Sequence, residues 1–258
     1  MSGYIKNFLK FRPLLSELVA RDIKIKYRRS VLGVLWTLLN PLCMMIILSI
    51  VFSNIFKFDV ENFPLYVLSG QVIFNFFNDA TTSSMTSIIS SASLIKKVYV
   101  PKYLFVLSRI VSSFINLMAA FTALLLVMVA TRTELHYTAF LSFVPLFMVV
   151  VFSLGVGLIL AALTVKFRDI IHLYSVFTTG LMYLTPVIYP MSILPAGIKT
   201  VVMLNPLTNY LIMFRGLMLE NTLPTFQSLL IGILEMGVVL ILGVYVFYKN
   251  QDEFILNI

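Results

Sequence analysis

The chain has 258 residues, of which 60% are hydrophobic and only 12% are charged, and its mean hydropathy is +0.98. A soluble domain is about 25% charged and about 45–50% apolar, so the composition excludes an ordinary soluble domain and indicates an integral membrane protein. The net charge of +8 would suit a nucleic-acid binder, but the charged residues lie between long apolar runs, which decides against that class. The single cysteine, Cys43, excludes an internal disulfide.

Residues 1–30 form a basic N-terminal segment that is expected to be cytoplasmic, and residues 12–29 within it predict an amphipathic helix along the membrane surface. Asp22 and Lys26 interrupt the apolar face of this interface helix and, being four residues apart, are expected to pair. The alternative is a basic flank that only sets the orientation of the chain. The charged stripe of the helix consists of Glu17, Arg21, Lys24 and Arg28.

Between Arg21 and Leu42 the sequence changes from basic to apolar, as it does where a chain enters a bilayer. Residues 31–258 are expected to form one transmembrane domain. Its apolar runs are continuous rather than alternating, so they predict helices and not strands, and each is near the ~20 residues that cross a bilayer. The predicted fold is an all-α integral membrane protein with six spans, at about 32–56, 65–89, 104–130, 140–165, 170–188 and 225–247.

The distribution of Lys and Arg sets the expected orientation of these spans. Fifteen of the 19 basic residues fall on the same side as the N-terminus, and the other four are Lys57, Arg132, Lys199 and Arg215. Cytoplasmic loops carry the excess of basic residues, so both termini are predicted to be cytoplasmic.

Residues 190–224 do not fit a simple loop, because prolines punctuate two apolar pieces, Ile198–Leu204 and Leu207–Leu219. Neither piece is long enough to cross the membrane. We therefore predict two short re-entrant helices whose backbone is covered by protein. One further full span is the alternative, and it would put the C-terminus outside.

The second predicted span is unusually polar, and such a face is costly against lipid, so it should face protein or a water-filled path. Asp79 in this span and Glu235 in the sixth are acids near mid-membrane, which makes both candidates for a substrate contact or a proton relay. For Asp79 the alternative is a bond to a facing helix. The polar residues of the span are Asn75, Asn78, Asp79, Thr81, Thr82, Ser83, Ser84, Thr86 and Ser87.

The loop Ser93–Tyr103 places apolar and basic residues side by side and stops at Pro101. Such an amphipathic knob between two spans suits docking into a groove on a partner, and an ordinary basic inside loop is the alternative. The nucleotide-binding pattern G-x-x-x-x-G-K-[ST] is absent, so the chain is not expected to hydrolyse ATP by that route. His136 and His172 fall on opposite sides of the predicted membrane and cannot share a metal.

Several short motifs resemble the permease subunits of type-two ABC exporters, most closely the branch that exports polysaccharides such as O-antigen, capsule and teichoic acid chains. Leu94–Lys97 with Pro101 resembles the coupling helix of that family, although Val100 stands where an aromatic residue is usual. The opening signature is similar at Arg21-Asp22, Tyr27-Arg28, Ser30, Leu32-Gly33, Trp36 and Pro41-Leu42, and later positions are similar at Phe167-Arg168-Asp169, Pro186-Val187-Ile188-Tyr189 and Asn205-Pro206.

The resemblance implies a homodimer of six-span permease subunits in a bacterial inner membrane. Each subunit would bind a separate cytoplasmic ABC ATPase subunit, so that two ATPase copies hold ATP and Mg²⁺ while this chain is no enzyme and binds no cofactor. The implied substrate is a glycan carried on a polyprenyl-diphosphate lipid. The residues implied to couple the chain to the ATPase are Leu94, Ile95, Lys96, Lys97, Tyr99, Val100 and Pro101.

Two kinds of side chain are candidates for the substrate path, because aromatic rings can stack on the apolar faces of sugars and basic residues can attract an ionic lipid headgroup. The alternative for the aromatic residues is packing or anchoring at the membrane interface. The rival functions are export of drugs or lipids by the same architecture and a membrane-bound enzyme of envelope lipid metabolism. The path candidates are Arg28, Arg29, Phe74, Phe77, Asp79, Tyr183 and Tyr189.

Overall fold

The computed structural model describes residues 2–28, 30–55 and 62–257, and within these ranges all regular secondary structure is helical. The predicted all-α class is therefore confirmed. The first half of the chain contains α1 (Ser2–Tyr27), η1 (Gly33–Leu35), α2 (Trp36–Ile55), α3 (Phe63–Met85), α4 (Ser87–Ser90), α5 (Ala92–Ile95) and α6 (Tyr103–Ala130). The second half contains η2 (Tyr137–Ser142), α7 (Phe143–Lys166), α8 (Ile170–Tyr183), η3 (Met191–Ile193), α9 (Ala196–Met203), α10 (Pro206–Met218), α11 (Phe226–Asn250), η4 (Gln251–Glu253) and α12 (Phe254–Asn257).

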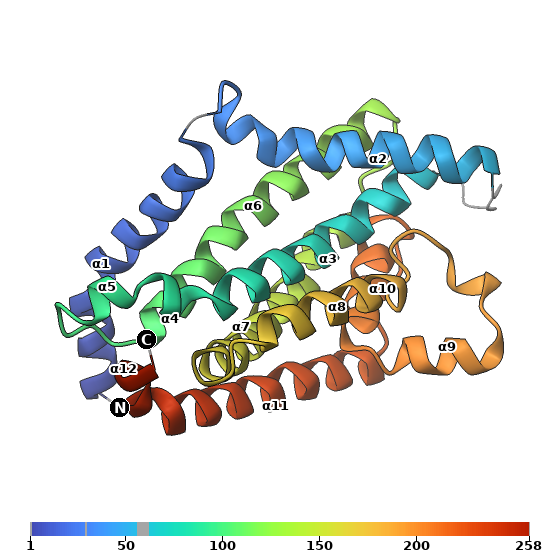
Figure 1. Ribbon diagram of the computed structural model, residues 1–258. Helices are drawn as coiled ribbons and strands as arrows, with labels where there is room; N and C mark the ends of the chain where they lie inside the picture. The colour runs from blue at the N-terminus through green and yellow to red at the C-terminus, as the bar shows by residue number, and fades with distance from the viewer. Residues whose placement is uncertain (1, 29, 56–61, 258) are drawn as a thin grey trace.

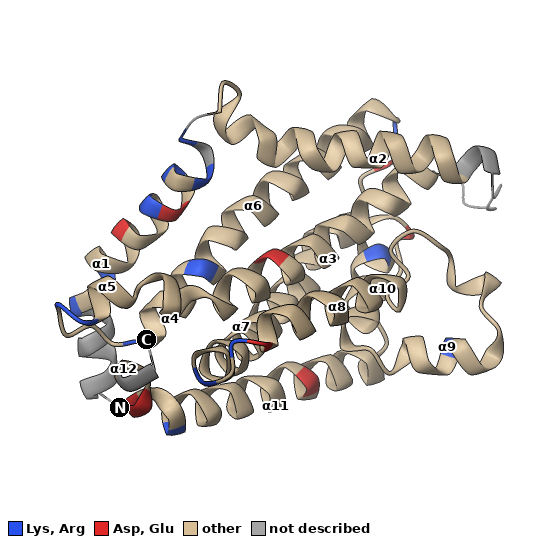
Figure 2. Cartoon of the chain, in the orientation of Figure 1, with Lys and Arg blue, Asp and Glu red and all other residues tan. Residues whose placement is uncertain are grey.

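The long helices run alongside one another in an elongated bundle (Figure 1). Helices α1, α5 and α12 gather at one end of it, together with both ends of the chain, and α9 and α10 lie toward the opposite end. Lys and Arg are concentrated at the end that carries α1 and α5 (Figure 2). This is the charge asymmetry expected of a bundle with one cytoplasmic end.

Four helical segments of the described chain are long and apolar enough to cross a membrane: Gly33–Phe52, Tyr103–Ala130, Tyr137–Lys166 and Phe226–Glu253. They match the first, third, fourth and sixth predicted spans. Helix α3 has 23 residues, or about 34 Å at 1.5 Å per residue, but it is too polar to qualify on composition. Helix α8 is apolar but has only 14 residues. The count of six spans therefore stays a prediction.

Two predicted spans are wrong in their ends. The helix predicted over 65–89 stops at Met85, and the next residues form the separate one-turn helices α4 and α5. The helix predicted over 170–188 stops at Tyr183. Pro186 follows closely, and a proline disfavours helical backbone at the residue before it. The helix therefore ends before the apolar run does.

Helices α9 and α10 coincide with the two apolar pieces recognised between residues 190 and 224. Asn205 begins α10 by accepting a hydrogen bond from the backbone N–H of Leu207 at 3.1 Å, and Pro206 occupies the first turn. Most of α10 is buried, including Tyr210 and Phe214, whereas α9 is exposed apart from Val202. The existence of two short helices is confirmed, and their position within a membrane stays a prediction.

Arg215 of α10 fixes the turn that follows α8. Only 5% of this residue is exposed, and its guanidinium donates to the carbonyl oxygens of Tyr66, Pro186 and Val187 at 2.7–3.0 Å. It also donates to Ser69 Oγ at 3.1 Å and lies 3.5 Å from the centroid of the Tyr66 ring. One side chain thus joins α10, α3 and the turn, and its charge is balanced by carbonyl dipoles and a π face.

Helices α7 and α11 are in close backbone contact at two glycines. A Cβ on Gly155 would lie 2.7 Å from the backbone of Val239 and Leu240, and a Cβ on Gly243 would lie 2.9 Å from Cα of Gly155. Small residues allow helices to approach this closely in a membrane, where packing rather than the hydrophobic effect holds helices together. Gly237, also on α11, has open space where its Cβ would be.

The substitution Gly243→Ala is expected to lower the midpoint of thermal unfolding in detergent, because the added methyl group would force α7 and α11 apart. Gly237→Ala is the matched control on the same helix. It is expected to leave stability unchanged or to raise it by up to about 1 kcal/mol, since alanine is the better helix former. Equal effects of the two substitutions would contradict the close contact.

Candidate functional site

The sequence-predicted docking segment, residues 93–103, begins inside α5, continues through the connection between α5 and α6 and ends at the first residue of α6; we call it the docking loop. Its tip consists of Lys96, Lys97, Val98 and Tyr99, all exposed, and Tyr99 is 89% exposed. Pro101 and Lys102 lead from the tip into α6. The tip therefore presents two ammonium groups beside an apolar residue and a phenol ring.

The base of the docking loop is apolar and buried. Ile95 before the tip and Val100 after it are 8% and 7% exposed, while Leu94 is half-buried. Val100, which stands where the resembled family has an aromatic residue, thus faces the protein rather than a partner. The amphipathic division predicted for this loop is present, and its binding to a partner stays a prediction.

Ile95 and Val100 belong to a packed group of apolar side chains that we call the basal cluster. It joins segments that lie far apart in the sequence, because α1, α4, the docking loop, α6, α7, α11 and α12 all contribute to it. Close-packed side chains resist compression, so a displacement of α1 or of the docking loop is passed to the long helices. The members are Leu18, Ile88, Ile95, Val100, Leu104, Phe105, Val106, Leu158, Ala161, Ala162, Val165, Phe247 and Phe254.

Helix α1 has the two-sided character that the sequence predicts for an interface helix. Leu18 and Val19 are buried against the bundle, and three members of the charged stripe, Glu17, Lys24 and Arg28, are exposed. The fourth member, Arg21, is half-buried and lies 3.4 Å from Asp22. The stripe therefore faces away from the bundle along most of its length.

Asp22 attaches α1 to α6. Its side chain is only 5% exposed, and one carboxylate oxygen lies 3.0 Å from Nη1 of Arg109, whose side chain is 22% exposed. Arg109 also donates to Ser90 Oγ of α4 at 3.2 Å. Sequence reasoning used Arg109 only to count charges, although a lone arginine six residues into an apolar run is itself a signal of a buried partner.

Lys26 attaches α1 to α3. Its ammonium group lies 3.4 Å from the carboxylate of Asp79, which also accepts hydrogen bonds from Ser113 Oγ at 3.2 Å and Asn116 Nδ2 at 3.0 Å. The predicted pair between Asp22 and Lys26 is therefore wrong. Both residues lie on the face of α1 that packs on the bundle, and each finds a partner on a different helix there. Asp79 bonds to facing helices, and its contact with substrate stays a prediction.

A shallow hollow of about 520 Å³ opens where α1 ends, lined by Ile25, Lys26, Arg28 and Ser30. Two basic side chains at its wall make it suited to an anionic group. Arg29, the neighbouring candidate, lies outside the described residues.

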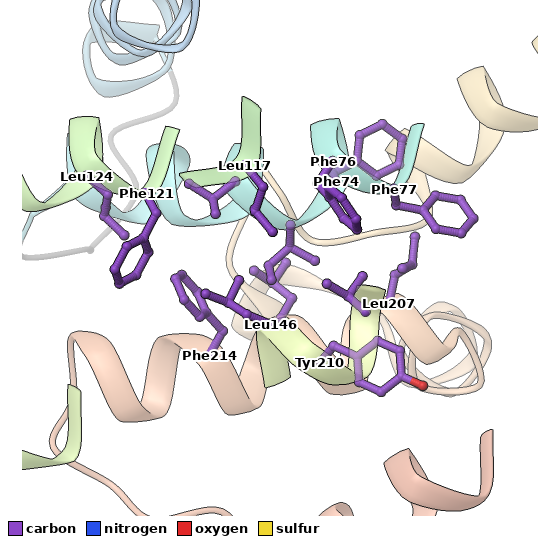
Figure 3. Close-up of a cluster of buried hydrophobic side chains, with 14 of the residues drawn as sticks. Phe74, Phe76, Phe77, Leu117, Phe121, Leu124, Leu146, Leu207, Tyr210 and Phe214 are labelled. Atoms are coloured by element: carbon purple, nitrogen blue, oxygen red, sulfur yellow. The ribbon is translucent and has the colours of Figure 1, made fainter. Parts of the chain in front are cut away.

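The aromatic path candidates fall in two different environments. Phe74 and Phe77 are 4% and 3% exposed, and they point into the core among side chains from other helices (Figure 3). The Phe77 ring stacks on that of Phe152 with centroids 5.9 Å apart, so both rings pack the core in this conformation. Tyr183 is exposed and Tyr189 is half-buried, and the Tyr189 hydroxyl donates to the Tyr183 carbonyl at 2.6 Å.

The polar residues of α3 also divide between two environments. Thr81 and Ser84, together with Ser87 at the start of α4, are buried inside the bundle, and Thr81 donates to the carbonyl of Phe77 and accepts from the hydroxyl of Tyr174. This half of the prediction, polar groups facing protein, is confirmed. Asn75, Asn78 and Thr82 recur at helical spacing on the other side, where Asn75 and Thr82 are exposed. We call these three residues the polar stripe.

The other mid-membrane acid, Glu235 of α11, is half-buried and accepts from Nδ2 of Asn209 at 3.5 Å. Its contact is thus with α10, at the end of the bundle away from α1. Among the described residues, no three His, Cys, Asp or Glu side chains gather closely enough to hold a metal ion.

The sequence pattern of the family described as "ABC-2 type transporter" matches residues 13–219, from α1 to the residue after α10. The chain is 27% identical over 257 residues to the O-antigen export system permease protein RfbA of Myxococcus xanthus, with 98% of each chain covered. It is 25% identical to a protein of the same name from Klebsiella pneumoniae, with 93% of each chain covered. It is 22% identical to the polysialic acid transport protein KpsM of Escherichia coli, over 93% of this chain and 94% of that protein.

The substitution Asp22→Asn is expected to destabilise the protein by about 2–3 kcal/mol, less than the cost for a fully buried pair because Arg109 retains some exposure. Lys26→Met is the comparison, since the pair with Asp79 is half-exposed on both sides and is expected to contribute at most about 1 kcal/mol. Thermal unfolding in detergent measures both. The double substitution Asp22→Asn with Arg109→Gln should recover part of the loss, and equal losses for Asp22→Asn and Lys26→Met would contradict this account.

Proposed function

Because the chain belongs to the ABC-2 type transporter family, we propose that it is the permease subunit of an ATP-driven exporter that carries a lipid-linked polysaccharide across a bacterial inner membrane. The observation that carries this proposal is the full-length similarity to an O-antigen export permease. Other relatives are named for transport of polysialic acid and export of capsule polysaccharide. These names favour a glycan of the O-antigen or capsule kind over a drug or a free lipid, and a transport subunit over a membrane-bound enzyme.

The proposed partner is a cytoplasmic ABC ATPase subunit, present in two copies that hold ATP and Mg²⁺. The docking loop supports this, because its tip offers Lys97 and the 89% exposed ring of Tyr99 on a base held by the basal cluster. A groove with an apolar floor and an acidic rim would complement such a tip. Helix α1 lies at the same end of the bundle (Figure 1), and its exposed charged stripe would supply a second surface.

The proposed topology has six crossings, made by α2, α3, α6, α7, α8 and α11, with α9 and α10 re-entrant from the far side. The position of both chain ends at one end of the bundle supports an even number of crossings. The concentration of Lys and Arg at that end supports a cytoplasmic location for both termini.

The proposed conduit forms between two copies of the permease, and the polar stripe of α3 lines it. Asn75, Asn78 and Thr82 are costly against lipid and well suited to hydroxyl-rich sugars. The hollow at Arg28 would receive the diphosphate of the lipid carrier, and the exposed ring of Tyr183 would contact the glycan further along. When the ATPase closes on ATP, displacement of α1 and the docking loop would reach α6, α7 and α11 through the basal cluster.

Deletion of the gene tests this function. Polyprenyl-linked glycan is expected to accumulate inside the cell while the surface glycan is lost, and the intact gene should restore export. Unchanged surface glycan together with a new sensitivity to drugs would favour the drug exporter instead.

The substitution Tyr99→Ala is expected to weaken binding of the ATPase subunit by about 2 kcal/mol, or roughly thirtyfold, because exposed tyrosines are frequent hot spots of interfaces. Binding is measured by titrating the ATPase subunit onto the permease in nanodiscs. Lys199→Ala, in the exposed helix α9 at the opposite end, is the control and should leave binding unchanged. Unaltered binding by Tyr99→Ala would remove the docking loop from the proposed interface.

A further inference from the structure

The C-terminal segment of the described chain, Gln251–Asn257, folds back onto the end of the bundle that carries the docking loop (Figure 1). It consists of η4 and α12, two short turns that follow α11 directly. The family pattern ends at residue 219, so this segment lies outside the region that defines the family. Its contacts suggest a role of its own.

Lys102 is the main link between this segment and the docking loop. It lies between Pro101 and the first residue of α6, where the loop returns to the bundle. Its ammonium group donates to the carbonyl oxygen of Gln251 and lies 5.7 Å from the centroid of the Phe254 ring. Lys102, the last residue before α6, is therefore held by a hydrogen bond and a cation–π contact to one short segment.

Phe254 provides the buried part of the attachment. It is 1% exposed and belongs to the basal cluster with Ile95 and Val100, the two residues that flank the tip of the docking loop. Its ring meets that of Phe247 edge to face, with centroids 5.3 Å apart. The next residue, Ile255, is 51% exposed. The segment thus places one aromatic ring in the same buried cluster as the base of the loop and leaves its neighbour outside.

An ion pair at the other side of the segment contributes less. Glu253 lies 3.7 Å from Nζ of Lys166 at the end of α7, but both side chains are more than half exposed. Water screens such a pair, and its contribution to stability is small. Of the contacts described here for this segment, those of Phe254 and Lys102 contribute most to its attachment.

We propose that the C-terminal segment Gln251–Asn257 is a positioning element for the docking loop, with Phe254 and Lys102 as its positioning residues. The tip of the loop is exposed, and the helix before it, α5, is a single turn. When Phe254 holds the base of the loop, a force on the tip is transmitted to α6 and α7. Without the Phe254 ring, the same force deforms only the loop. The inference rests on the proposed function, since it assigns a role in coupling to the ATPase subunit.

The first test needs only this chain. A nitroxide label is attached at Tyr99→Cys in a Cys43→Ser background, and the purified protein is placed in nanodiscs without any ATPase. Phe254→Ala is expected to shift the electron paramagnetic resonance spectrum toward its mobile component. Ile255→Ala is the matched control in the same segment and should leave the spectrum unchanged, as should Phe254→Leu, which keeps most of the buried volume. Lys102→Met, which keeps the apolar stem and removes the ammonium group, should give a smaller shift in the same direction as Phe254→Ala.

A destabilised fold could mimic this result, so Met218→Ala serves as a second control. Met218 is buried in α10 toward the opposite end of the bundle. It is expected to lower thermal stability while leaving the label immobile. An unchanged spectrum for Phe254→Ala, or an equal shift for Met218→Ala, overturns the positioning role.

The second test adds the ATPase subunit and measures ATP turnover stimulated by the permease. Phe254→Ala is expected to lose stimulation, Phe254→Leu to recover it and Ile255→Ala to behave as the unmodified chain. Full stimulation by Phe254→Ala overturns the role in coupling. If no ABC ATPase binds even the unmodified permease while Phe254→Ala still mobilises the label, the proposed function fails and the positioning of the loop stands.

Discussion

Close packing at one end of the bundle is the constraint on which the other features depend. The basal cluster brings Leu18 of α1 and Val100 of the docking loop into one apolar group with the ends of α6, α7 and α11. Neither a one-turn helix nor an isolated surface helix is stable alone, since most helix stability in proteins comes from packing. The basal cluster therefore both folds these segments and fixes their positions relative to the long helices, so exposed binding surfaces can rest on a rigid base.

At the opposite end of the bundle, polar contacts are added to the apolar packing of α3 and α10. Arg215 joins α10 to Tyr66 of α3 and to the turn at Pro186, where buried carbonyls take the place of a carboxylate. Helix α3 is common to both ends, because its Asp79 binds Lys26 of α1. Thirteen residues, or about 20 Å of helix, separate Tyr66 from Asp79. A movement of α1 thus has a short, continuous path through α3 to the turn at the far end.

Sequence reasoning succeeded where one segment determines its own structure. The apolar runs predicted the long helices, and the prolines around residues 198–219 predicted two short ones. It failed where the answer depends on a second segment: Asp22 and Lys26 have the right spacing to pair, yet Arg109 and Asp79 compete successfully because tertiary packing brings them closer. Phe77 and Phe254 could not be assigned for the same reason, since burial of a ring depends on which helices surround it.

The polarity of α3 limits what can lie beside this helix in a membrane. The Thr81 hydroxyl inside the bundle is satisfied locally, because it donates to the Phe77 carbonyl one turn back. The side-chain amides of Asn75 and Asn78 are larger hydrogen-bonding groups, and Asn75 is exposed on the single chain. Lipid cannot satisfy such groups. The stripe therefore requires water or another polar surface beside it, and the hydrated path proposed between two copies of the chain would supply both.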